Sequence, residues 1–363
     1  MDFKVLKSVY NAQIPNDYIE KIIKNIDHNK LIELYYSFLI KDSPDLEFTL
    51  TNKVERLSAC NRYWLIDRYD INKVKDFKKT NLCKDKFCNN CKKVKQASRM
   101  SRYIPEIEKY RCNLYHLVLT QPNVHGIELK QIISKMAHSF SMLNRYLKGD
   151  KKIKGIDFSS WGYLGSVRSL EITFNDDSYH PHYHVGIILE NGIGEKIHSN
   201  QYSHNRYNPK LKRLFSEKEV LIQKIWYLLM NGEKVTKKAI DELQVGYSCM
   251  IDKFKDDDYA ELFKYMTKAT DEEDLIFSYH NFKTLYFALH RIKQIQGYGV
   301  LYRIDDTDLD SEVDKVYIEM LELLQEKENP VETYERPQDL LLDNEYILIS
   351  RKKIFQYLRE IQE

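Results

Sequence analysis

The sequence has neither a membrane span nor a secretion signal. No apolar run approaches the roughly 18 residues that are needed to cross a bilayer. The first residues, MDFKVLKSVYNAQIPNDY, contain no apolar stretch of the roughly 7–15 residues found in signal peptides. We therefore expect a cytoplasmic protein with no membrane partner.

The sequence also has no G-x-x-x-x-G-K-[ST] loop of the kind that cradles nucleotide phosphates, which argues against a built-in helicase. It contains no internal repeat and no low-complexity linker. A chain of 363 residues, 43% of them hydrophobic and 30% charged, is long and apolar enough for two or three cores. Wholesale disorder is therefore excluded.

The net charge of +2 says little, but its distribution is uneven. Residues 303–345 hold 15 acidic and 4 basic residues, a balance of −11, whereas residues 1–302 hold 37 acidic and 48 basic residues, a balance of +11. A basic body with a separate acidic segment suits a polyanionic ligand. The alternative is an ordinary solvated surface with a solubilising tail.

We predict an α+β fold with a central antiparallel sheet and flanking helices, together with an N-terminal zinc-binding segment and a helical C-terminal extension. We expect strands over 114–120, 164–174 and 182–189, the last two forming a hairpin. Helices are expected over most of 1–56 and over 128–147, 217–229, 258–268 and 312–328. The predicted division is a helical region (1–56), a zinc-binding basic segment (57–103), a domain of mixed helices and strands (104–304) and an acidic helical region (305–363).

Four of the six cysteines form a pattern typical of a metal site. Cys88 and Cys91 are separated by two residues, so that both thiolates can reach one ion from a tight turn, and Cys83 and Cys60 complete a tetrahedral set. In a reducing compartment four thiolates favour zinc. Free thiols clustered by chance, or disulfides in a secreted protein, are the alternatives.

The run His180-Pro-His-Tyr-His-Val185 is the most informative in the chain. Side chains on a strand alternate between its two faces, so His182 and His184 share one face, and His180 is at the same parity. Glu171, on the partner strand, can add a carboxylate if the polar faces coincide. Two imidazoles and a carboxylate suit Mn²⁺, Mg²⁺ or Zn²⁺ acting as a Lewis acid. An exposed polar face of an ordinary hairpin is the alternative.

Glu261 and Tyr265 are four residues apart in the helix expected over 258–268, so they would share one face of it. A phenol with an ordinary pKa of about 10 is a poor nucleophile at neutral pH, and nearby lysines such as Lys268 would help to activate it. Because the chain has 27 tyrosines, the spacing of Glu261 and Tyr265 indicates a nucleophile only in combination with the histidines.

Together these blocks resemble the single-tyrosine rolling-circle plasmid replication initiators of the HUH endonuclease superfamily. The cysteine segment, LVLTQPNV (117–124), HPHYHV (180–185) and ELFKYMTK (261–268) resemble the family's zinc, first, metal and tyrosine motifs in order, and RIKQIQGYG (291–299) resembles its closing sequence. The family usually has Gly after the first cysteine and Pro inside the last Cys-x-x-Cys, where this chain has Asn61 and Asn89.

The resemblance implies an HUH nuclease core that nicks one strand at a plasmid's double-strand origin. Tyr265 would form a 5′-phosphotyrosyl link, Mn²⁺ or Mg²⁺ would be bound by His182 and His184 with Glu171 or His180, and Glu261 would activate the water for the terminating cleavage. Partners would be single-stranded or hairpin origin DNA and a host helicase; the oligomeric state is left open. Basic residues near the zinc segment would contact phosphates: Lys84, Lys86, Lys92, Lys93, Lys95, Arg99 and Arg102.

Other readings of the sequence remain. A non-enzymatic zinc-dependent DNA-binding regulator would use the histidines as a second structural site and would bind DNA without cutting it. A relaxase or a single-strand transposase shares the metal-and-tyrosine chemistry, although relaxases generally place the tyrosine before the histidines. A metallohydrolase acting on small molecules is a more distant possibility.

Overall fold

The computed structural model describes residues 16–60, 63–67, 69–70, 73–74, 77–80, 82–199, 213–263, 267–269, 278–302 and 346–350. The chain divides into two compact units. Unit 1 contains residues 1–95 and 307–363, and unit 2 contains residues 96–306. Among the helices described, none is both long enough and apolar enough to cross a membrane.

The described part of unit 1 begins with two helices, α2 (Asn16–Asp42) and α3 (Glu47–Ser58), joined by the short η1 (Pro44–Leu46). The helical expectation for this region is confirmed over its described residues. Ile32, Tyr36 and Leu39 lie at the spacing of one helix face and are buried, as are Leu50 and Leu57 of α3.

Unit 1 also holds a three-stranded sheet in which β1 (Tyr63–Asp67) pairs antiparallel with β4 (Phe77–Thr80) on one side and with β14 (Tyr346–Ser350) on the other. Strands β2 (Tyr69–Asp70) and β3 (Lys73–Val74) form a separate pair. The described part of the acidic C-terminal region is therefore a strand. The helix expected over 312–328 lies outside the described residues.

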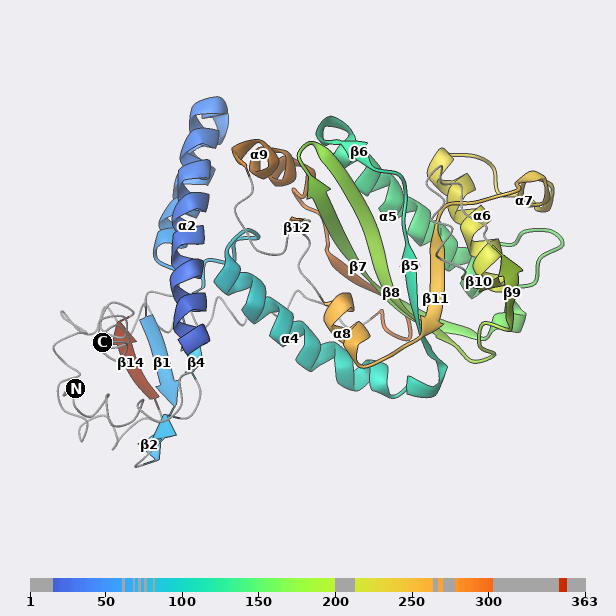
Figure 1. The fold of residues 1–363 in the computed structure, drawn as a ribbon, viewed down its shortest axis with the longest axis horizontal. Helices are drawn as coiled ribbons and strands as arrows, with labels where there is room; N and C mark the ends of the chain where they lie inside the picture. Colours follow the sequence, from blue (N-terminus) through green and yellow to red (C-terminus); the bar gives the residue numbers. More distant parts are fainter. Residues whose placement is uncertain are drawn as a thin grey trace. The chain divides into compact units, whose positions relative to one another are not determined.

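Unit 2 is built on a seven-stranded sheet (Figure 1). Its main path runs β11 (Cys249–Lys253), β5 (Leu114–Leu119), β8 (Ser178–Leu189), β7 (Tyr163–Asn175) and β12 (Thr267–Ala269), while β13 (Ile295–Gly299) also pairs with β7 and β6 (Val124–His125) with β8. The predicted β7–β8 hairpin is present and is tighter than expected. Asn175 pairs with Ser178, and Asp176 adopts a φ of 51°, a conformation that aspartate tolerates in such turns.

Helices cover both faces of this sheet. On one face lies α5 (Gly126–Lys148), whose Phe140 ring is 5.6 Å from the ring of Tyr183 on β8. On the other face, Ile188 of β8 shares a buried cluster with Ile107 of α4 (Asn89–Glu108) and Leu262 of α8 (Asp257–Leu262). The remaining elements are α6 (Glu217–Asn231), α7 (Lys237–Glu242), α9 (Tyr279–Ala288), η2 (Arg111–Asn113), η3 (Ser159–Trp161) and the hairpin β9 (Lys196–Ser199) and β10 (Leu214–Ser216). The predicted α+β class is confirmed.

Two expectations need correction. The helix expected over 258–268 ends at Leu262, and Thr267–Ala269 forms β12, which pairs with Ile172–Phe174 of β7. That pairing is parallel, so the sheet is antiparallel except at this edge. The strand β7 offers unpaired backbone groups at its edge, and satisfying them overrides the local helical pattern.

Candidate active site and cysteine cluster

The β7–β8 pairing brings two histidines and one carboxylate together. Glu171 lies opposite His182 in the register, and Ser169 lies opposite His184. Strand alternation therefore places Glu171, His182 and His184 on one face of the sheet, and Tyr183 and Val185 on the face that α5 covers. All three polar side chains are buried, with 5–9% of each residue exposed.

The ligand atoms of this group converge. Glu171 Oε2 lies 2.9 Å from His184 Nε2 and 3.3 Å from His182 Nε2, and the three atoms lie within 4.8 Å of one another. Burial raises the pKa of Glu171, but its interactions with the imidazoles of His182 and His184 outweigh this effect and lower the pKa overall. The carboxylate is therefore ionised, and the donor set fits a divalent cation.

His180 is outside this converging group, although it shares the parity of His182. Its ring stacks on that of His182 with the centroids 5.1 Å apart, and its carbonyl oxygen lies 3.1 Å from His182 Nδ1. A carbonyl can only accept, so His182 donates from Nδ1 and directs Nε2 toward Glu171. Of the two residues that the sequence offers as a third ligand, Glu171 is the one whose ligand atom converges with those of His182 and His184.

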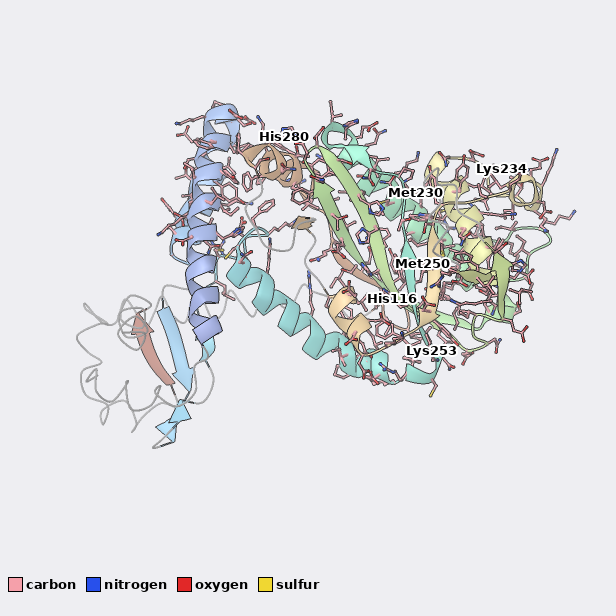
Figure 2. All side chains as sticks on the ribbon, in the orientation of Figure 1. His116, Met230, Lys234, Met250, Lys253 and His280 are labelled. Atoms are coloured by element: carbon pink, nitrogen blue, oxygen red, sulfur yellow. The ribbon has the colours of Figure 1, made fainter. Side chains whose placement is uncertain are left out.

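Sequence reasoning missed two residues beside this group, His116 on β5 and Asp258 on α8. His116 Nε2 lies 3.0 Å from His184 Nδ1, and His116 Nδ1 lies 2.9 Å from Asp258 Oδ1. Figure 2 labels His116 on the sheet close to α8. Burial and the neighbouring His184 lower the pKa of His116, and they outweigh the opposite effect of Asp258 and Glu261. A single histidine in LYHLVLT carries no pattern that could have identified it.

The residues of the predicted tyrosine motif are described only in part. Glu261 lies on α8, within range to act electrostatically on His116. Tyr265 lies outside the described residues. Lys268 is in β12 opposite Thr173, and its side chain is outside the description as well. The nearest described residues on either side of Tyr265 are Phe263, which directly follows α8, and Thr267, the first residue of β12.

The four cysteines of the predicted zinc site come together in unit 1. The Sγ atom of Cys91 lies 3.4 Å from that of Cys83 and 3.7 Å from that of Cys60, and Cys60 and Cys88 are 3.6 Å apart. All four are buried, and their sulfurs lie within 4.8 Å of one another. Cys88 directly precedes α4 and Cys91 lies in its first turn, so a helix end replaces the expected tight turn.

Hydrogen bonds around these sulfurs support a metal site. Asn29 Nδ2 of α2 donates to Cys88 Sγ at 3.3 Å, and backbone N–H groups donate to Cys60 and Cys83 at 3.4 Å each. Contacts with the other thiols lower the pKa of Cys88, while contacts within the cluster raise the pKa of Cys91. The donor set and its surrounding donors fit Zn²⁺.

The basic residues predicted to contact DNA are placed unevenly. Lys86 is exposed, and Lys84 and Lys92 are half-buried. The side chains of Lys93, Lys95 and Arg102 lie outside the description. Arg99 is buried and donates to Gln294 Oε1 at 2.5 Å, so its expected place on a DNA-facing surface is wrong. Its guanidinium is used inside unit 2.

Comparison with known proteins places this chain in a family. The model of the replication protein family Rep_1 matches residues 74–342. Similar proteins, each called protein rep, come from Bacillus sp (35% identical over 151 residues, 39% of this chain and 46% of that protein) and from Staphylococcus aureus (35% over 148 residues, 38% and 58%). Another comes from Lentilactobacillus hilgardii (28% over 196 residues, 52% and 54%).

The chain spans about half the length of the curated relatives it matches. No solved structure matches it. The family match covers most of the chain, from β3 past the closing strand β13, and includes both the histidine strand and three of the four clustered cysteines. The resemblance predicted from the sequence is confirmed, and the chain belongs to the Rep_1 family of replication proteins.

Proposed function

We propose that this protein initiates rolling-circle replication of a plasmid by nicking one DNA strand at the double-strand origin. The observation that carries the proposal is the convergence of Glu171, His182 and His184 on the sheet face against which α8 packs. Membership of the Rep_1 family supports the same function. Plasmid DNA as the substrate also supports a cytoplasmic location.

We assign Tyr265 as the nucleophile. Leu262 of α8 reaches the sheet beside the histidines, because a Cβ added at Gly186 would lie 3.5 Å from its Cδ2. Thr267 pairs with Ile172, the residue next to Glu171. Leu262 and Thr267, one on each side of Tyr265, therefore lie on elements that adjoin Glu171, His182 and His184, which we call the metal group. This supports the assignment.

The proposed reaction is a transesterification. A divalent ion such as Mn²⁺ or Mg²⁺, bound by Glu171, His182 and His184, would polarise the non-bridging oxygens of the scissile phosphate. The phenol oxygen of Tyr265 forms a bond to phosphorus while the bond from phosphorus to O3′ breaks. The phenol loses one proton and O3′ gains one, which leaves a 3′-OH primer and a 5′-phosphotyrosyl link. Lys268 would stabilise the phenolate by its charge.

The covalent link retains the energy of the phosphodiester bond, so rejoining the strand needs no nucleotide. Glu261 is assigned as the base that activates water for the terminating cleavage. Its place on α8, within electrostatic range of His116, supports this role.

Origin DNA, single-stranded or extruded as a hairpin, is the proposed partner. The zinc segment with Lys84, Lys86 and Lys92 would contact backbone phosphates, together with Lys93, Lys95 and Arg102. Exposed tyrosines would stack on unpaired bases. A host helicase would then open the duplex, because the chain has no phosphate-binding loop of its own.

A single experiment tests the nucleophile. The protein is incubated with Mn²⁺ and an end-labelled single-stranded origin oligonucleotide, and covalent adducts are separated on a denaturing gel. We expect an adduct with the unaltered protein and with Tyr247→Phe, a tyrosine on the α6 side of the unit, and none with Tyr265→Phe. An adduct that persists in Tyr265→Phe overturns the assignment. Tight DNA binding without any cleavage would favour a non-enzymatic regulator instead.

A further inference from the structure

A continuous row of polar side chains leads away from the metal group. From Glu171 Oε2 it passes to His184 Nε2 at 2.9 Å, and from His184 Nδ1 to His116 Nε2 at 3.0 Å. From His116 Nδ1 it ends at Asp258 Oδ1, 2.9 Å away. Four separate elements, β7, β8, β5 and α8, contribute to this row in the described part of unit 2.

The outer members of the row are held firmly. Only 11% of the His116 side chain and 18% of the Asp258 side chain are exposed. The ring of Phe254 lies edge-on to His116, with the centroids 5.9 Å apart. The second oxygen of Asp258 accepts from the backbone N–H of Lys255 at 2.6 Å, which fixes the orientation of the carboxylate.

The chemistry of the end group sets the direction of the hydrogen bonds. An ionised carboxylate only accepts, so His116 must donate to Asp258 from Nδ1. In a neutral imidazole the other nitrogen then accepts, so His184 must donate from Nδ1 to His116 Nε2. The lone pair of His184 is left on Nε2, the atom that faces Glu171 and His182, where a divalent ion held by these three residues would accept it.

We propose that His116 and Asp258 are positioning residues for the metal group, and that together they hold His184 in the tautomer and orientation in which Nε2 binds the divalent ion. Histidine ligands of metals usually donate their second N–H to a carboxylate or a carbonyl. Here the donation reaches the carboxylate through a second imidazole.

The hydrogen bond between His116 and Asp258 also joins the metal group to α8. Asp258 lies in the first turn of this helix, and Leu262 at its end packs beside Gly186 of β8. This row of hydrogen-bonded side chains, the relay, therefore also fixes the position of α8, the helix that precedes Tyr265. The consequence for catalysis rests on the proposed function. Loss of the relay would then slow nicking as well as weaken the binding of metal.

The test measures Mn²⁺ affinity on the full chain without DNA, by calorimetry and by electron paramagnetic resonance. We expect His116→Ala to weaken binding by about 10–100-fold, the range found for such outer partners. His116→Gln should recover part of the loss because its amide oxygen can accept from His184. His138→Ala, which removes an exposed histidine of α5, should bind Mn²⁺ as the unaltered protein does.

The order of the row gives a second measurement. Asp258 acts on His184 only through His116, so adding Asp258→Ala to His116→Ala should weaken Mn²⁺ binding by less than about twofold more. A folded His116→Ala variant that binds Mn²⁺ within twofold of the unaltered protein overturns the proposal. So does a full additional loss from Asp258→Ala in the double variant.

A third measurement needs no variant. In the Zn²⁺-loaded protein with ¹⁵N-labelled histidines, long-range ¹H–¹⁵N spectra should show His184 protonated at Nδ1 and metal-bound at Nε2. The opposite tautomer overturns the proposal. None of these readouts involves DNA, so a protein that shows the relay but forms no Tyr265 adduct would refute the nicking function and leave the relay intact.

Discussion

The six cysteines occupy three chemically different environments. Four form the buried cluster of unit 1, Cys112 is exposed, and Cys249 is fully buried on β11. Burial raises the pKa of the Cys249 thiol, and the nearby carboxylate of Glu219 raises it further. Because the thiolate is the reactive form, these environments predict different rates of alkylation.

In the zinc-loaded protein, iodoacetamide at neutral pH should modify Cys112 alone. Removal of the metal with a strong chelator should make the four clustered thiols reactive as well, and Cys249 should react only after denaturation. Mass spectrometry of the intact protein counts the adducts. Cys112→Ser is the control and should show no early adduct. Early modification of Cys249 would contradict its assigned burial.

Replacing Glu261 with alanine should separate the two cleavages of the proposed reaction. The tyrosine performs the first attack, whereas the carboxylate is needed only for water. We expect the initial adduct to form at a rate within about threefold of the unaltered protein, while its hydrolysis falls by the 10²-fold or more typical of a lost general base. Time courses of adduct formation and release measure both steps. Equal loss of both would reject this division of roles.

The three residues of the metal group could be predicted from the sequence, because strand alternation places Glu171, His182 and His184 on one face of the sheet once β7 pairs with β8. His116 and Asp258 could not. Their contacts depend on the register between β5 and β8 and on how α8 packs on the sheet, and neither leaves a local sequence pattern. Arg99 was misjudged for the same reason, because its partner Gln294 is 195 positions away.

Among the elements, the hairpin β9–β10 and the start of α6 depend on one buried carboxylate. Glu219 is 0% exposed and accepts from the backbone N–H groups of Ser216 and Ile251 at 2.7 and 2.8 Å. It also pairs with Arg213 at 3.1 Å and with Lys196 at 3.4 Å. A single side chain thus ties β9, β10, α6 and β11 together.

Glu219→Gln should destabilise the protein by about 3 kcal/mol, because the amide removes the charge that compensates two cations and places N–H groups where acceptors are needed. The midpoint of urea unfolding, followed by circular dichroism, measures the change. Glu217→Gln, an exposed acid in the same first turn, is the matched control and should cost less than about 0.5 kcal/mol. An equal loss of unfolding free energy in the two variants would show that Glu219 contributes no more to stability than an exposed acid does.

Local patterns predicted α5 and the β7–β8 hairpin well, because one face of each is continuously apolar. They failed in the second part of the helix expected over 258–268, because that helix ends at Leu262 and Thr267–Ala269 is a strand. The outcome there depends on whether a neighbouring strand has a free edge, which is a property of the assembled sheet.

At the scale of the whole molecule, the two units rely on different sources of stability. Unit 2 has a large sheet covered on both faces, whereas unit 1 joins α2 to the cysteine cluster through a few polar contacts. His28 Nε2 lies 3.0 Å from the carbonyl oxygen of Phe87, and Tyr36 donates to Asp85 at 2.5 Å. Folding of unit 1 should therefore depend on the metal.

Removal of zinc should unfold unit 1 and spare unit 2. We expect amides of α2 near Asn29 to lose protection from hydrogen exchange after chelation or in Cys91→Ser, while β5 and β8 keep theirs. Cys112→Ser, outside the cluster, is the control for the cysteine substitution. Unchanged protection of α2 in metal-free protein would contradict this dependence.

The pairing of β1 with β14 has a consequence for biosynthesis. After the last residue of β1, the ribosome must add 279 residues (346 minus 67) to reach the first residue of β14, and these include every strand described in unit 2. At roughly 5–20 residues per second this takes roughly 15–55 s. For that interval the edge of the nascent β1 that later pairs with β14 is open to pairing with other chains, so this protein is prone to aggregate while it is being translated.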